Sequence, residues 1–163
     1  MAADPEAREF QNALARFASG VTIVTAVDDE GRPWGFTASA FSSLSLQPPL
    51  VLVCLDQRAN CYATFTTTAR FVVSILTEDH DELALRFASK RRDKFADGGF
   101  ASGLDQDIPA VADALASLTC RVARRIPAGD HMIVIGEVED AFAGDGSPLV
   151  YYRRDFHAIQ GRG

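Results

Sequence analysis

Short runs of β-branched and aliphatic residues recur along most of the chain, a pattern typical of strands. The expected strands are residues 21–27, 32–37, 50–55, 71–76, 118–126, 132–142, 149–152 and 156–159. The run 50–55 is apolar at every position, which predicts a strand buried on both faces. Within 132–142, Gly136 indicates a bulge or a close approach.

Helical periodicity is confined to a few short segments. Near the N-terminus, apolar residues recur at i, i+3, i+4 and i+7, at Phe10, Ala13, Leu14 and Phe17, and Gly20 stands in the place of a C-terminal cap. Residues 61–67 and 81–87 predict two more helices. Residues 88–103 predict a long surface loop, and 108–116 a short helix or an irregular cover. Many short strands with few helices predict a mainly β fold, a small closed antiparallel barrel.

Residues 35–45, GFTASAFSSLS, are dense in small side chains and hydroxyls and lie between two predicted strands. Such a segment has too few large apolar side chains to form a hydrophobic core. Small residues let a ligand approach the backbone N–H groups closely, and Ser and Thr add donors and acceptors. Pro48 and Pro49 then hold the chain extended before the next strand. We therefore expect a loop that wraps a flat polar ligand.

The length of 163 residues predicts one domain, residues 1–163. A formal net charge of −6 argues against nucleic acid or an anionic membrane as the main partner. No apolar run is long enough to span a bilayer, and the N-terminus lacks the apolar core of a signal peptide. Cys54, Cys61 and Cys120 form no C-x-x-C pair, which predicts free thiols in a reducing cytoplasm.

Several familiar chemistries have no motif in this sequence. There is no G-x-G-x-x-G after a strand, no G-x-x-x-x-G-K-[ST] and no G-x-S-x-G. The three histidines fall in no metal-ligand spacing and the cysteines do not complete one, so no metal site is expected. The polar segments that remain as candidates are 35–45, 56–60, 87–95 and 129–131.

Blocks of sequence in a fixed order resemble the flavin reductase-like family. They are GVTIVT (20–25), GFTASAF (35–41), SLSLQPP (43–49), LVLVCLD (50–56), FAS (87–89), DKF (93–95), GDH (129–131) continuing to IGEV (135–138), and PLVYY (148–152). They extend over nearly the whole chain, from about Phe10 to Ile159. One block alone would be weak support, whereas their order and spacing together make the resemblance specific.

The resemblance implies a split β-barrel homodimer that binds FMN or FAD and reduces it with NADH or NADPH. Many relatives are the reductase component of two-component monooxygenases and deliver reduced flavin to a separate oxygenase. The flavin contacts that it implies are Thr37, Ala38, Ser39, Ala40, Phe41, Ser43, Cys54, Leu55, Asp56, Ala59, Asn60, Phe87, Ala88, Ser89 and Lys90. The contacts that it implies for the nicotinamide cofactor are His131 and Tyr152. Arg153 and Arg154 are further candidates for a phosphate of that cofactor, and are equally typical of surface charges.

These implied contacts form groups, each of which would contact a different part of the flavin. Residues 37–41 with Ser43 would lie along the ring and the ribityl chain, and residues 54–56 would form the floor. Asn60, which stands where relatives often carry Ser or Thr, and residues 87–89 would face the phosphate, with 90–92 adding positive potential. The same basic run is equally typical of a solvated surface. Trp34 fits either the core or a place over the ring.

The residue types agree with this interpretation. Hydride transfer between two stacked flat rings needs close contact and exclusion of water, but no general acid, base or metal from the protein. We therefore assign no catalytic side chain and give His131 only the role of a helper. Two alternatives stay open: a non-catalytic carrier or sensor of flavin or tetrapyrrole, and a reductase that uses bound flavin to reduce another acceptor such as a corrinoid. The sequence does not decide FMN against FAD, or NADH against NADPH.

Overall fold

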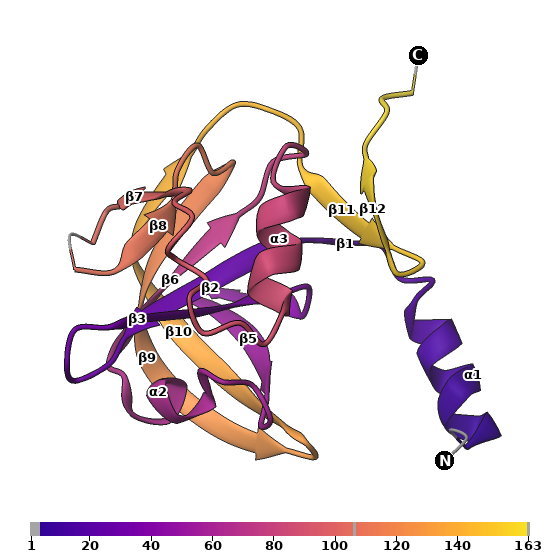
Figure 1. The fold of residues 1–163 in the computed structure, drawn as a ribbon, viewed down its shortest axis with the longest axis horizontal. Coiled ribbons are helices and arrows are strands. Elements are labelled where there is room, and N and C mark those ends of the chain that lie inside the picture. The colour runs from indigo at the N-terminus through magenta and orange to yellow at the C-terminus, as the bar shows by residue number, and fades with distance from the viewer. Residues whose placement is uncertain (1–3, 106, 163) are drawn as a thin grey trace.

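The computed structural model describes residues 4–105 and 107–162, which contain three helices and twelve strands (Figure 1). The helices are α1 (Pro5–Leu14), α2 (Tyr62–Thr67) and α3 (Asp81–Ala88). The strands are β1 (Ser19–Gly20), β2 (Thr22–Val27), β3 (Pro33–Ala38), β4 (Phe41–Leu46), β5 (Pro49–Asp56), β6 (Arg70–Ile75), β7 (Phe100–Ser102), β8 (Pro109–Val111), β9 (Ala116–Ala128), β10 (His131–Ala143), β11 (Leu149–Tyr152) and β12 (Asp155–Ala158). The expected mainly β fold is confirmed.

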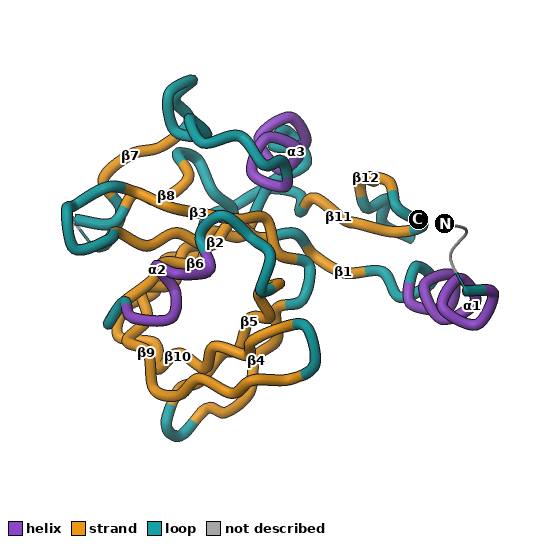
Figure 2. The backbone as a smooth tube through the Cα atoms, turned by 60° about the horizontal axis from the view of Figure 1, so that its bottom comes forward, coloured by secondary structure: helices purple, strands orange, loops and turns teal. Residues whose placement is uncertain are grey.

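Seven strands form the main sheet in the order β3-β2-β6-β9-β10-β5-β4, and each neighbouring pair is antiparallel. The two edge strands are consecutive in sequence, because β3 passes into β4 through Ser39 and Ala40. The carbonyl of Ala40 accepts a 3.0 Å hydrogen bond from the backbone N–H of Cys54 in β5. The sheet therefore curls on itself, as Figure 2 shows. The closed barrel that we expected is not formed, because β3 and β4 do not pair with each other in the described ranges.

Burial alternates along β5, which lies between β10 and the edge strand β4. Val51, Val53 and Leu55 are buried in the interior of the curved sheet. The residues between them are only half-buried, and Leu52 and Cys54 line a surface groove. The expectation that residues 50–55 are buried on both faces is therefore wrong. A strand beside the edge of a curved antiparallel sheet has only one face turned to the core.

Two close contacts fix how the core packs. Phe65 of α2 is fully buried and meets Phe36 edge-on, with 5.2 Å between the ring centroids. On β10, a Cβ added to Gly136 would lie 2.5 Å from Cζ of Phe71 and 2.8 Å from Cβ of Cys120. No side chain fits there, so the close approach expected at Gly136 is confirmed, and the β9–β10 register shifts beside it.

The hydroxyl-rich segment is not the loop that we expected. Its first residues end β3, and Phe41–Leu46 form the edge strand β4, which pairs with β5. An edge strand takes its hydrogen bonds from one neighbour and can expose polar side chains on the other side, so a Ser-rich sequence suits it. Only Ser39 and Ala40 lie between the two strands.

α3 packs beside β2 and β3 and covers a second group of buried residues (Figure 1). Its Phe87 is buried and lies 4.9 Å from Phe95 and 5.1 Å from Phe100 between ring centroids. Gly35 of β3 makes this packing possible, because a Cβ there would lie 2.9 Å from Cε1 of Phe87. The absence of one side chain therefore brings the end of α3 against β3, which positions the site described below.

The segment after α3 forms the expected long loop, but it ends in a hairpin. Phe100–Ser102 pair with Pro109–Val111 as β7 and β8. The backbone N–H of Val111 donates a 3.1 Å hydrogen bond to Oγ of Ser74 in β6, which ties the hairpin to the main sheet. The short helix expected as one alternative for residues 108–116 is not formed: Pro109–Val111 are a strand, and residues 112–115 are irregular, with Ala114 buried against the core.

α1 and the C-terminal strands lie beside the main sheet, and α1 projects away from it (Figure 1). β1, β11 and β12 form a small separate sheet. α1 has no buried residue, and its apolar side is open to solvent: Phe10 is 65%, Leu14 56% and, just beyond the helix, Phe17 80% exposed. Among the helices described here, none has the length and apolar character needed to cross a membrane.

Candidate functional site

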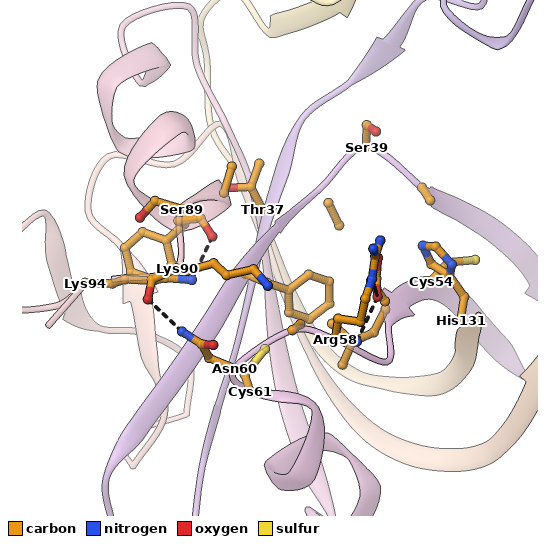
Figure 3. A pocket seen from close by; sticks show the side chains of 18 residues that line it. Thr37, Ser39, Cys54, Arg58, Asn60, Cys61, Ser89, Lys90, Lys94 and His131 are labelled. Atoms are coloured by element: carbon orange, nitrogen blue, oxygen red, sulfur yellow. Dashed lines mark hydrogen bonds and ion pairs between the residues drawn. The ribbon is translucent and has the colours of Figure 1, made fainter. Parts of the chain in front are cut away.

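A pocket of about 420 Å³ opens where four parts of the chain meet (Figure 3). The end of β3 with residues 39–40, the end of β5 with residues 58–61, and the end of α3 with residues 89, 90 and 94 contribute most of its lining. His131, the first residue of β10, completes it. Small-molecule sites have volumes of roughly 300–1,000 Å³, so this pocket is large enough for one.

One end of the pocket is built from small residues. Figure 3 shows Ser39, Cys54 and His131 at this end, away from Asn60. The backbone N–H groups of Ser39 and Ala40 donate no hydrogen bond to any other residue in the described ranges. Because the side chains are small, a flat ring can reach these donors. Burial raises the pKa of the Cys54 thiol, so this side chain stays neutral near pH 7.

The ends of β5 and β10 place a carboxylate opposite an imidazole. Asp56 and His131 are register partners across this strand pair. The Arg58 side chain donates to both carboxylate oxygens of Asp56, at 3.1 Å from Nε and 2.8 Å from Nη2. These hydrogen bonds lower the pKa of Asp56 well below its usual range, so it stays ionised. Nδ1 of His131 lies 2.6 Å from Oδ1 of Asp130, which holds the ring in place and lowers the pKa of Asp130.

The other end of the pocket carries amide, hydroxyl and ammonium groups. Nδ2 of Asn60 donates a 2.8 Å hydrogen bond to the backbone carbonyl of Lys90. Ser89 donates from Oγ to the carbonyl of Arg86 at 2.6 Å, where α3 ends. Lys90 lines the pocket, and no carboxylate in the described ranges forms an ion pair with it. This end can therefore receive an anionic group.

Lys94 is a buried cation in the wall of the same pocket. Only 9% of the residue is exposed. Its Nζ donates a 3.0 Å hydrogen bond to the carbonyl of Phe87 and lies 3.5 Å from the carbonyl of Gly35. Burial lowers the pKa of Lys94. Because the two carbonyls belong to α3 and β3, Lys94 holds these elements together and adds positive potential beside the pocket.

Most of the residues that we predicted to bind flavin line this one pocket: Thr37, Ala38, Ser39, Ala40, Cys54, Leu55, Asp56, Ala59, Asn60, Phe87, Ala88, Ser89 and Lys90. His131, predicted for the nicotinamide cofactor, lines it as well. The fold thus brings together residues that are up to about ninety positions apart in the sequence. Their individual roles stay predictions.

Five of the predicted residues lie elsewhere. Phe41 lines the groove beside α1, and Ser43 is exposed on β4. Tyr152 ends β11, and Arg153 and Arg154 form the turn before β12. The Arg153 guanidinium lies 5.5 Å from the centre of the Tyr152 ring, and Arg154 donates a 3.0 Å hydrogen bond to α1. The fold separates these three from the pocket because β11 and β12 belong to the small sheet with β1.

Four lining residues were not predicted as individual flavin or nicotinamide contacts: Phe36, Arg58, Cys61 and Lys94. Three of them, Phe36, Arg58 and Lys94, lie within the candidate segments 35–45, 56–60 and 87–95. A signal was present for two of them. Arg58 follows Asp56 by two residues, a spacing that lets the guanidinium return to the carboxylate. Lys94 is the middle residue of the DKF block that carries the family resemblance. Phe36 and Cys61 look like ordinary core residues, and both are buried.

The chemistry that this pocket offers is that of a binding site for a flat, anionic ligand. It combines free backbone donors, an amide, hydroxyls, one imidazole and two ammonium groups. Within residues 4–105 and 107–162, no group of three or more His, Cys, Asp or Glu side chains is arranged to hold a metal ion. A curved antiparallel sheet with such a pocket defines a ligand-binding β domain, and the lining suits a ligand with a planar part and a negative end.

Comparison with known proteins identifies the family. Residues 14–160 match the flavin reductase like domain, and the chain belongs to that family. It is 49% identical to the reductase component of 4-nitrophenol 4-monooxygenase/4-nitrocatechol 2-monooxygenase from Rhodococcus opacus, over 91% of this chain and 78% of the relative. It is 46% identical to the actinorhodin polyketide dimerase of Streptomyces coelicolor, over 91% of this chain and 84% of the relative.

A solved structure of the same architecture is also similar in sequence. The NADH:FAD oxidoreductase of Streptomyces globisporus, in complex with NAD and FAD fragments, superposes with a TM-score of 0.89. The two chains are 31% identical, and the match covers 98% of this chain and 97% of that one. The two folds therefore correspond along almost their whole length.

Proposed function

We propose that this protein is an NAD(P)H:flavin oxidoreductase, which transfers a hydride from NADH or NADPH to FMN or FAD. The observation that carries the proposal is the single pocket that gathers most of the residues expected to hold flavin. A monooxygenase reductase component and an NADH:FAD oxidoreductase among its relatives support it. The Streptomyces coelicolor relative is named for another reaction. The proposal therefore rests on the pocket as well as on sequence similarity to the other relatives.

The two unlike ends of the pocket suit the two ends of a flavin. The ring fits the end with Ser39 and Ala40, whose free N–H groups can donate to its polar edge. The phosphate fits the other end, where the Lys90 ammonium supplies a charge-assisted hydrogen bond. Asn60 holds the Lys90 backbone at 2.8 Å, and Lys94 adds positive potential from the wall.

The flavin supplies the hydride acceptor, and the protein supplies position and a dry environment. The small residues 38–40 let the ring lie against the backbone, which fixes its plane. His131, held by Asp130 at 2.6 Å, stands at the end of the pocket assigned to the ring. From there its imidazole would meet the nicotinamide donor. Stacking the two rings at close range lowers the barrier without any proton transfer from a side chain.

A second copy of the chain covers the apolar surface that this fold leaves open. Leu14 and Phe17 from the α1 region, with Phe41 and Leu52, line an apolar groove of about 580 Å³. At the end of β4, Leu46 is 88% exposed. Apolar surface of this extent marks an interaction site. The homodimer predicts a mass of twice 17.6 kDa in light scattering. A mass of 17.6 kDa at every concentration would rule it out.

The cellular role proposed for the protein follows from the same relatives. It acts as a single domain, residues 1–163, in the cytoplasm and delivers reduced flavin to a separate monooxygenase. The reductase component of the Rhodococcus opacus monooxygenase supports this role. Cys54, Cys61 and Cys120 are all free thiols, as suits a reducing compartment.

The decisive assay is anaerobic oxidation of NADH and of NADPH by the purified protein, with and without FMN, FAD or riboflavin. Turnover that requires added flavin and saturates with it supports the proposal. Tight flavin binding without turnover would instead favour a carrier or sensor. Turnover only with another acceptor, such as a corrinoid, would favour a reductase that uses bound flavin as a relay.

A further inference from the structure

A second groove, of about 560 Å³, adjoins the cationic end of the proposed flavin pocket. Asn60 lines both cavities, so the two adjoin at this residue. Trp34 and Phe95 contribute aromatic surface to the groove, and Arg32, Arg92 and Asp93 contribute charge. The groove therefore begins where the flavin phosphate is expected to lie and leads away from the end assigned to the ring.

Trp34 is held as a fixed aromatic surface in this groove. Its Nε1 donates a 3.0 Å hydrogen bond to Oδ2 of Asp28, and the side chain is half-buried against the core. The polar edge of the indole is thus satisfied within the chain, and part of its ring system stays exposed to the groove. A fixed, partly exposed indole is suited to stacking on a planar heterocycle such as a nucleobase.

The charged side chains of the groove differ in whether they are free to bind a ligand. Arg32 is already engaged, with Nε 3.4 Å from Asp28 and a second contact to Glu30. Asp93 accepts from Arg91 at 3.1 Å. Arg92 is exposed and forms no ion pair or side-chain hydrogen bond with the described residues. Its guanidinium is thus the cation that the groove can offer to an anion.

We propose that this groove takes the adenylate half of FAD, and that this chain therefore binds FAD more tightly than FMN. The inference rests on the proposed function and extends it to the choice of flavin. Lys90 and Arg92 are two residues apart on the same loop, so the loop presents one cation to each cavity. The two phosphates of FAD would pass beside Asn60, where the cavities adjoin, and the adenine would stack on Trp34.

An adenylate group is also part of NADH, and the position of the groove favours FAD. The groove opens from the end with Asn60 and Lys90, whereas His131 lies at the opposite end of the pocket (Figure 3). A nicotinamide stacked on the ring near His131 would have to carry its adenylate past the whole flavin to reach Trp34. The same groove is reached directly from the flavin phosphate.

The test compares dissociation constants for FAD, FMN and NADH in the whole protein and in two variants. Arg92→Ala removes an exposed cation that has no ion-pair partner among the described residues. Trp34→Leu keeps an apolar side chain while removing the stacking surface. We expect FAD affinity to fall about tenfold in each variant, and FMN affinity to change less than about threefold. Arg124→Ala is the matched control, because Arg124 is exposed and lines neither cavity.

Three outcomes would overturn the inference. Wild-type protein that binds FMN as tightly as FAD would do so, as would equal losses for both flavins in Arg92→Ala. A loss confined to NADH would assign the groove to the nicotinamide cofactor instead. None of these outcomes changes whether the wild-type protein reduces FMN, which is measured separately. If no flavin is reduced by the wild-type protein, it is the proposed function that fails, so the two failures are distinguishable. Because Arg92 is a surface residue, its variant keeps the test valid even if Trp34→Leu destabilises the fold.

Discussion

Asn60 donates a 2.8 Å hydrogen bond from Nδ2 to the backbone carbonyl of Lys90. The two residues lie on different loops, one following β5 and the other following α3, and their contact joins the loops at the cationic end of the pocket. Lys90 belongs to a basic run that would look like a solvated surface by sequence alone. The hydrogen bond anchors the backbone of that run at Lys90, whose side chain lines the pocket.

Replacing Lys90 by alanine should weaken binding of phosphate-bearing flavins selectively. We expect the dissociation constant for FMN to rise about tenfold, since a hydrogen bond to a charged group is lost, and that for riboflavin to stay the same. Fluorescence titration with both ligands measures the ratio. Lys90→Arg keeps the charge and should retain most of the affinity for FMN. Equal losses for FMN and riboflavin in Lys90→Ala would show that Lys90 does not meet the phosphate.

Ser39 and Ser43 were both expected to touch flavin, but only Ser39 lines the pocket. Ser39→Phe places a ring where the flavin ring is proposed to lie and should abolish flavin binding. Ser43→Phe adds the same volume at an exposed position of β4 and should leave binding within about twofold of wild type. Both variants need a circular dichroism spectrum to confirm folding. A folded Ser39→Phe protein with normal affinity would refute the placement of the ring.

His131 stands at the end of the pocket assigned to the flavin ring. Replacing it distinguishes a contact with the nicotinamide, the hydride donor, from a contact with the flavin, the hydride acceptor. We expect His131→Ala to lower kcat/KM for NADH about tenfold, because the donor loses a contact that positions it. Flavin affinity should change less than about twofold. His157→Ala is the control, since His157 lies on β12 away from the pocket. Loss of flavin binding with unchanged NADH kinetics would assign His131 to the flavin instead.

The three thiols should react very unequally in the folded protein. Burial raises the pKa of Cys61 to about 11 and that of Cys120 to about 12, so near pH 8 roughly one thiol in a thousand or fewer is ionised. Cys54 is half-buried and lines the pocket. We therefore expect iodoacetamide to modify Cys54 alone, faster as the pH rises, and saturating FMN to slow it. Mass spectrometry identifies the modified residue, and rapid labelling of Cys120 without denaturant would contradict this account.

The raised pKa values of Cys61 and Cys120 also predict how the stability of the fold changes at alkaline pH. The unfolded thiols ionise from about pH 9, whereas the folded ones keep their protons to higher pH. The folded state then binds more protons than the unfolded state, so the free energy of unfolding falls as the pH rises above about 9. Urea titrations across this range should show a decreasing midpoint.

The sequence predicted the elements whose pattern is local. The β-branched run of β2 and the apolar run of β6 stand out by their own residues, and Gly136 was expected to mark a close approach, which the packing of Phe71 and Cys120 explains. The blocks that resemble the family also predicted most of the residues that line the pocket.

What the sequence could not show depends on contacts between distant segments. β4 is a strand only because β5 offers it a free edge, and its Ser-rich sequence gives no strand signal. Lys94 stands in a charged run, yet it is buried because carbonyls of α3 and β3 converge on its ammonium group. Tyr152 was placed by resemblance, but its strand joins the small sheet with β1 rather than the sheet that bears the pocket.

The central claim is that a hydride passes from a nicotinamide to a flavin held in this pocket. The most direct measurement mixes the flavin-loaded protein with NADH or NADPH rapidly and without oxygen, and follows the absorbance of the oxidised flavin. The account predicts loss of that absorbance with at least one donor, at a rate slowed by deuterium at the transferred position of the nicotinamide. A flavin that stays bound and oxidised in the presence of both donors would contradict it.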